Sequence, residues 1–74
     1  MNNIRRKELA KIISELDNLK YRIETVKDEE QETLDNMPEN LQGSSRTDAM
    51  EEAIDTMEEA MDSIDEAIDT LGEL

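Results

Sequence analysis

Residues 50–74 read MEEAIDT, MEEAMDS, IDEAIDT and LGEL, so this segment repeats every seven residues. The apolar side chains recur in alternating steps of four and three, the spacing of a helix that packs along one seam. In heptad letters, the seam consists of Met50, Met57, Ile64 and Leu71 at d and of Ile54, Met61 and Ile68 at a. Alanine fills the g positions within the three complete repeats. The pattern predicts one long amphipathic helix.

Acidic residues follow the same period on another side of this helix. They fill every e, f and b position except Gly72, and these positions lie within an arc of about 100°. The acidic ridge, as we name it, consists of Glu51, Glu52, Asp55, Glu58, Glu59, Asp62, Asp65, Glu66 and Asp69. Three carboxylates per heptad give about one negative charge per 3.5 Å, close to the roughly 3.4 Å per phosphate of one DNA strand.

A second seam occupies the first third of the chain, again in steps of three and four. It consists of Leu9, Ile12, Leu16, Leu19, Ile23 and Val26. The spacing predicts a helix over residues 3–36 that begins at a cap formed by Asn2 or Asn3. Its last two turns have a weaker seam, because Glu30 and Thr33 stand at core positions.

The connector between the two helices contains two strong breakers. Pro38 ends the first helix, and Gly43 supplies the left-handed conformation that often separates helices. The turn is therefore predicted over 37–44 and the second helix over 45–72. The candidates for its N-terminal cap are Ser44, Ser45 and Thr47. So short a connection folds the second helix back, which predicts one all-α domain, an antiparallel two-helix hairpin of the coiled-coil type.

Charge is unevenly distributed along the 74 residues, which hold 8 basic and 21 acidic side chains and carry a net charge of −13. Residues 1–27 carry +3, residues 28–46 carry −5 and residues 47–74 carry −11. Such a field disfavours direct binding to nucleic acid or to an anionic membrane, and it favours a basic protein surface as partner. The chain has no run of about 18 apolar residues and no secretory signal, so we expect a cytoplasmic protein.

The antiparallel arrangement brings bases of the first helix beside acids of the second. We expect one group of bases near Asp69 and Glu73, and another beside the middle of the acidic helix. The first group is Arg5, Arg6, Lys7 and Lys11, and the second is Lys20, Arg22 and Lys27. Each exposed pair contributes well under about 1 kcal/mol, but together they favour antiparallel pairing.

Both apolar stripes are broader than a two-stranded seam requires. A chain of this size usually needs disulfides, a metal or oligomerisation to be stable, and this one has no cysteine. We therefore expect a homodimer in which two hairpins form a four-helix bundle; the alternative is one hairpin packed on another protein.

Catalysis and metal binding find little support. The chain has no histidine, no cysteine and no glycine-rich phosphate loop, and its acids lack the order of a calcium-binding loop. We expect no enzyme activity, no cofactor and no specific metal site. The ridge is either a solvated face or a binding surface. A solvated face is the commoner role of such a charge run, but the binding interpretation gains support because the like charges repel one another with no base after Arg46.

Two smaller features have alternative interpretations. Met50, Met57 and Met61 either fill the core or form an adaptable binding surface. Tyr21 falls at an outer f position, where it is either an ordinary surface residue or an anchor for a partner.

Three stretches together resemble a known group of proteins. They are MNNIRRKELAKIISEL at 1–16, LDNMPENLQGSSR at 34–46 and MEEAIDTMEEAMDSIDEAIDTL at 50–71. The chain resembles short acidic helical-hairpin proteins encoded by phages and mobile elements of Gram-positive bacteria, and the connector is the most specific part of the likeness. The resemblance implies no particular activity and transfers no functional residue. It implies a setting in which small acidic proteins often inhibit host nucleases, repair enzymes or other defence proteins.

Two functional hypotheses follow. The first is an anti-defence type inhibitor or regulator that binds a basic host protein through the ridge, as a nucleic-acid mimic, in the host cytoplasm. The second is a structural or adaptor module that binds through its apolar stripe. Binding through the ridge should weaken steeply with salt, whereas binding through the stripe should not.

Overall fold

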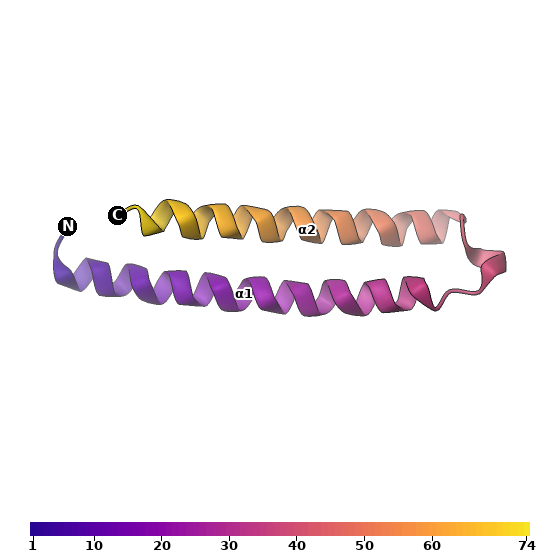
Figure 1. The fold of residues 1–74 in the computed structure, drawn as a ribbon, viewed down its shortest axis with the longest axis horizontal. Helices are drawn as coiled ribbons and strands as arrows, with labels where there is room; N and C mark the ends of the chain where they lie inside the picture. The colour runs from indigo at the N-terminus through magenta and orange to yellow at the C-terminus, as the bar shows by residue number, and fades with distance from the viewer.

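The computed structural model describes all 74 residues as two long antiparallel helices joined by a short connector (Figure 1). Helix α1 spans Asn3–Asp35, the 3-10 turn η1 spans Glu39–Leu41 and helix α2 spans Ser45–Gly72. The hairpin forms a rod whose Cα atoms extend over 60 × 15 × 11 Å, with both chain ends at one end and the connector at the other (Figure 1). The predicted all-helical hairpin is confirmed.

Side-chain caps fix where both helices begin. The Asn2 side chain accepts a hydrogen bond from the backbone N–H of Arg5 at 2.8 Å. Ser44 Oγ accepts from the N–H of Thr47 at 3.4 Å, and the Thr47 hydroxyl donates to the Ser44 carbonyl at 2.8 Å. Among the candidates named from the sequence, Asn2 and Ser44 are therefore the caps, since each satisfies an otherwise unpaired backbone N–H.

The connector reverses the chain through two local features. The carbonyl of Pro38 accepts a hydrogen bond from the N–H of Leu41 at 2.9 Å, which closes η1. Gly43 has a φ of +79°, the left-handed region that side chains with a Cβ rarely adopt. These features aim α2 back along α1.

The buried core is small and lies close to the connector. Only Thr47, Met50 and Ile54 are buried, and all three belong to the first ten residues of α2. The remaining seam residues of α2 are half-buried, namely Met57, Met61, Ile64, Ile68 and Leu71. Helix α1 contains no buried residue. One hairpin thus leaves most of its apolar side chains partly in contact with solvent.

Helix α1 is rotated relative to the seam predicted from its heptads. Leu9, Ile12, Leu16 and Ile23 are half-buried, but Leu19 and Val26 are 44% and 53% exposed. Half-buried residues appear instead at the e positions, as Ile13, Lys20, Lys27 and Leu34. The aliphatic stems of the two lysines cover α2 while their ammonium groups reach acids. On the other side, the alanine row of α2 gives Leu19 and Val26 little to contact.

Candidate binding surfaces

The antiparallel pairing gives the hairpin two unlike flanks. On one flank, e positions of α1 face e positions of α2, and both cross-helix salt bridges form there. We call it the ion-pair flank. On the other flank lie the g positions of both helices, the exposed d side chains Leu19 and Val26 of α1 and the d side chains of α2, and we call it the apolar flank. Each flank offers a different kind of contact to another molecule.

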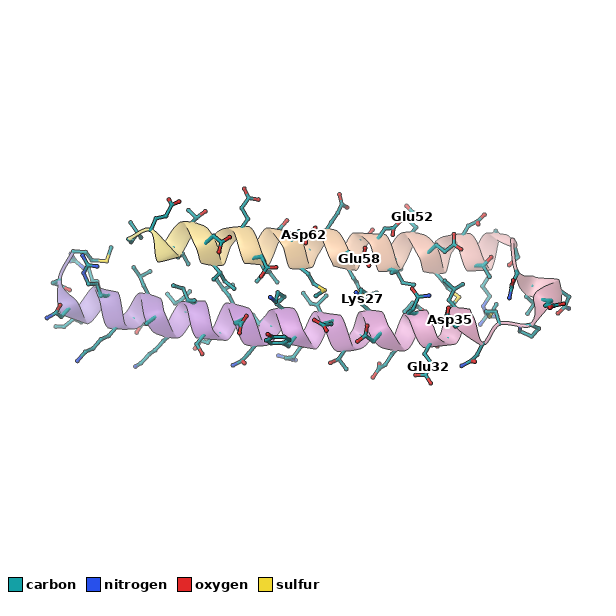
Figure 2. The ribbon with its side chains drawn as sticks, viewed as in Figure 1. Lys27, Glu32, Asp35, Glu52, Glu58 and Asp62 are labelled. Carbon is teal, nitrogen blue, oxygen red and sulfur yellow. The ribbon has the colours of Figure 1, made fainter.

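Two lysines of α1 organise the ion-pair flank. Lys20 Nζ lies 2.8 Å from Asp65 Oδ1 and 3.8 Å from Asp17 Oδ1. Lys27 Nζ lies 3.6 Å from Glu58 Oε1, and Figure 2 shows these two side chains between the helices. The hydrogen bond to Asp65 raises the pKa of Lys20, against a smaller opposing effect of desolvation. These pairs hold the helices in register, although solvent reaches their carboxylates.

The acidic ridge divides into two parts in the structure. All nine of its residues are exposed, but Glu58 and Asp65 are engaged by lysines of α1. The other seven carboxylates form no ion pair: Glu51, Glu52, Asp55, Glu59, Asp62, Glu66 and Asp69. Among them, the b and f positions point away from the ion-pair flank, and Glu52 lies along the outer edge of α2 in Figure 2. An uncompensated row of charge therefore remains open to a partner.

The bases of the N-terminal group do not pair with the acids of α2 as expected. No ion pair joins Arg5, Arg6, Lys7 or Lys11 to an acid of α2. Arg6 instead donates from Nη1 to the backbone oxygen of Leu74 at 2.8 Å. The heptad explains this correction. Lys7 stands at an outer f position, and Arg5 and Lys11 stand at d and c, whereas the acids expected to meet them stand at b and f on the outside of α2.

An open groove of about 560 Å³ runs along the middle of the apolar flank. Its lining consists of Leu19, Arg22, Ile23, Val26, Thr56, Met57, Ala60 and Ile64. The groove exists because the large d side chains of both helices border Ala60, which is too small to fill the space between them. Arg22 is its only charged residue and, contrary to expectation, forms no ion pair with α2. The sequence signal for the groove was the alanine row beside the d positions.

Tyr21 and the methionines occupy intermediate environments. Tyr21 is 55% exposed, and its ring centroid lies 5.3 Å from Lys20 Nζ, beside the ion-pair flank. Met50 belongs to the buried core, whereas Met57 and Met61 are half-buried. The methionines are thus mainly packing residues in one hairpin, with Met57 also facing the groove.

The structure contains no group of three or more acidic side chains arranged to hold a metal ion. Neither helix is long and apolar enough to cross a membrane. No family model, curated protein or solved structure matches the chain. The candidate surfaces are therefore the acidic ridge and the apolar flank, defined by geometry and charge alone.

Proposed function

We propose that this chain is a small acidic binding protein that docks its ridge on the basic cleft of a nucleic-acid-binding host protein. Binding there would exclude nucleic acid and so inhibit or regulate the host protein. The observation that carries the proposal is the row of seven unpaired, exposed carboxylates on one side of a straight helix. The density of the complete nine-residue ridge, near one charge per 3.5 Å, is close to that of a phosphate strand.

The ridge has the properties that electrostatic docking requires. A concentrated negative field speeds encounter with a basic surface and repels acidic ones. The b and f side chains can be reached without opening the hairpin, because no lysine of α1 holds them. The mutual repulsion of these acids is a cost that contact with a basic cleft would relieve. The likeness to phage and mobile-element proteins fits an anti-defence inhibitor acting in the host cytoplasm.

The test is charge reversal within the free part of the ridge. The ridge variant replaces Glu59, Asp62 and Glu66 with lysine, none of which forms an ion pair. The control variant replaces Asp28, Glu32 and Asp35 of α1 with lysine, exposed carboxylates that give the same change in net charge. Figure 2 shows Glu32 projecting from α1 on the side away from α2.

Immobilised chain should capture a basic host protein at low salt and release it on addition of duplex DNA, RNA or high salt. The ridge variant should lose this capture while keeping its helical circular dichroism, and the control variant should keep both. Equal capture by the ridge variant would show that the ridge is only a solvated face.

A second candidate is a structural or adaptor module that binds through its apolar side. It is favoured by the small core, since Met50 and Ile54 are the only buried apolar residues. In this case the hairpin pairs with another copy into a four-helix bundle or packs on a different protein. Binding of this kind should persist at high salt, because apolar burial does not depend on charge attraction.

A further inference from the structure

The apolar flank is incomplete as the surface of a monomer. Leu19 and Val26 project beside the groove, and Met57 and Ile64 contribute half-buried side chains from α2. Large apolar residues grouped around an open groove usually mark an interaction site. Since so little of this chain is buried, a second layer of helices on this flank would supply the missing core.

On its α2 side, the apolar flank carries no charge from Ala49 to Thr70. The c positions are small and uncharged, and the g positions within the repeats are alanine. In chain order these residues are Ala49, Ala53, Thr56, Ala60, Ser63, Ala67 and Thr70. Small side chains allow helix axes to approach to about 8 Å. A second copy, although equally acidic, can therefore pack here without pressing its carboxylates against those of the first.

The α1 side of the same flank contains charges of both signs. Its charged g positions are Glu8, Glu15, Arg22 and Glu29, and the Arg22 side chain has no acidic partner within its own chain. When two such rows meet in antiparallel fashion, Arg22 can lie beside Glu15 or Glu29 of the second copy. Each copy then supplies one Arg22 and one glutamate to equivalent pairs, which is what a two-fold symmetric contact requires.

The other faces are unsuitable for a second copy. The ion-pair flank is already occupied by Lys20 and Lys27, whose stems cover the seam there. The ridge would oppose like charges at close range.

The apolar flank also has an adequate size. A face as long as the 28 residues of α2, about 42 Å, and about 20 Å wide offers roughly 800 Å² per copy. That is the usual contribution of each partner to a stable interface.

We propose that a second copy of this chain packs on the apolar flank, centred on the groove between Val26 and Ala60. The resulting four-helix bundle buries Leu19 and Val26 and leaves both acidic ridges on its outside. The proposal rests on the self-association suggested above and is independent of what the ridge binds.

Sedimentation of two matched variants tests the interface. Val26→Glu places a charge in the groove, and Tyr21→Glu places one at a similarly exposed site outside it. Wild type and Tyr21→Glu should sediment at twice the chain mass of 8.5 kDa. Val26→Glu should raise the dimer dissociation constant at least about 100-fold, because the charge is buried without a partner. Equal dimerisation of Val26→Glu and Tyr21→Glu would overturn the proposal.

A labelling experiment identifies the buried face even if Val26→Glu fails to fold. The chain has no cysteine, so Ala60→Cys and Tyr21→Cys each introduce a unique thiol. Alkylation of Ala60→Cys should slow as the protein is concentrated and dimer forms, whereas alkylation of Tyr21→Cys should not.

The remaining outcomes separate this proposal from the others. A wild-type chain that stays monomeric when concentrated overturns both self-association and this interface. A dimer in which Ala60→Cys reacts at an undiminished rate overturns this interface alone. Protection of Ala60→Cys only on addition of another protein would assign the groove to that protein and likewise contradict the proposal. None of these results changes what the capture experiment shows about the acidic ridge.

Discussion

Lys20 Nζ lies 2.8 Å from Asp65 Oδ1, which joins residues 45 positions apart in the sequence. Seven residues further along α1 and seven residues back along α2, the same relationship recurs between Lys27 and Glu58 at 3.6 Å. Two pairs one heptad apart specify both the antiparallel direction and the register of the helices. A slip by one turn would separate both lysines from these acids.

The Lys20–Asp65 pair should make stability depend on pH in the alkaline range. The hydrogen bond raises the pKa of Lys20 in the folded state above 10.5, its ordinary value. The pair's contribution to the free energy of unfolding is therefore complete below pH 10.5, and it is lost as pH rises through the higher pKa of Lys20 in the folded state. Urea midpoints above pH 10.5 should fall more in wild type than in Lys20→Met, with Lys7→Met as a control that behaves like wild type. If the urea midpoints of wild type and Lys20→Met fall in parallel as pH rises, the Lys20–Asp65 pair is not the cause of the pH dependence.

Ile54 should be the most sensitive apolar position of α2. It is 6% exposed, so Ile54→Asp removes core packing and buries a carboxylate, a loss of about 3 kcal/mol or more. Combined with Ile64→Asp, it should largely unfold the chain. Ile4→Asp is the matched control, because Ile4 is 80% exposed and its loss should change stability by less than about 0.5 kcal/mol. Circular dichroism with urea titration measures both; similar losses at the two sites would contradict the observed burial.

The two glycines should respond in opposite directions to alanine. Gly43 has a φ of +79° and Gly72 is helical, and a Cβ at either site would meet no atom within 4 Å. Gly43→Ala should therefore cost about 1–2 kcal/mol through backbone strain alone. Gly72→Ala should be neutral or stabilising by up to about 1 kcal/mol, since alanine favours the helix. Thermal denaturation compares them, and a Gly43→Ala chain as stable as wild type would show that the connector can turn without a left-handed residue.

Salt should stabilise the folded chain at neutral pH. Few ion pairs bind the helices together, whereas a net charge of −13 opposes compaction. Screening should weaken repulsion more than attraction. It should raise Tm by about 5 °C, which corresponds to roughly 1 kcal/mol in the free energy of unfolding. The variant with lysine at 59, 62 and 66 has a net charge of −7 and should show a smaller rise. A Tm that declines steadily with added salt would mean that the salt bridges dominate.

Much of this hairpin could be predicted from its sequence because its signals are local. The heptads predict helices over 3–36 and 45–72, and the observed bounds are Asn3–Asp35 and Ser45–Gly72. Pro38 and Gly43 place the reversal between them. Each of these signals depends on neighbouring residues in one segment, so no knowledge of the packing is needed.

The rotation of α1 could not be predicted in the same way. Its apolar stripe is wide, since Ile13 stands beside the predicted seam, and several rotations would bury a similar area. The observed choice depends on the other helix, which offers Glu58 and Asp65 to lysines on one flank and leaves an open groove beside Val26 on the other. For the same reason, the division of the ridge into paired and unpaired acids became visible only in the structure.

The position of the three buried residues beside the connector has a consequence for how the hairpin forms. Contacts of Thr47, Met50 and Ile54 with α1 close the shortest loops between the two helices, so they cost the least chain entropy. The same three residues are also the most deeply buried in the chain. The two helices should therefore pair first beside the connector and then progressively toward the chain ends. Amide hydrogens near Ile54 should exchange slowest, and those near Ile4 should exchange fastest as the open end frays. A molecule that bound the end of the hairpin where both termini lie would therefore reach the seam residues there without unfolding the whole hairpin.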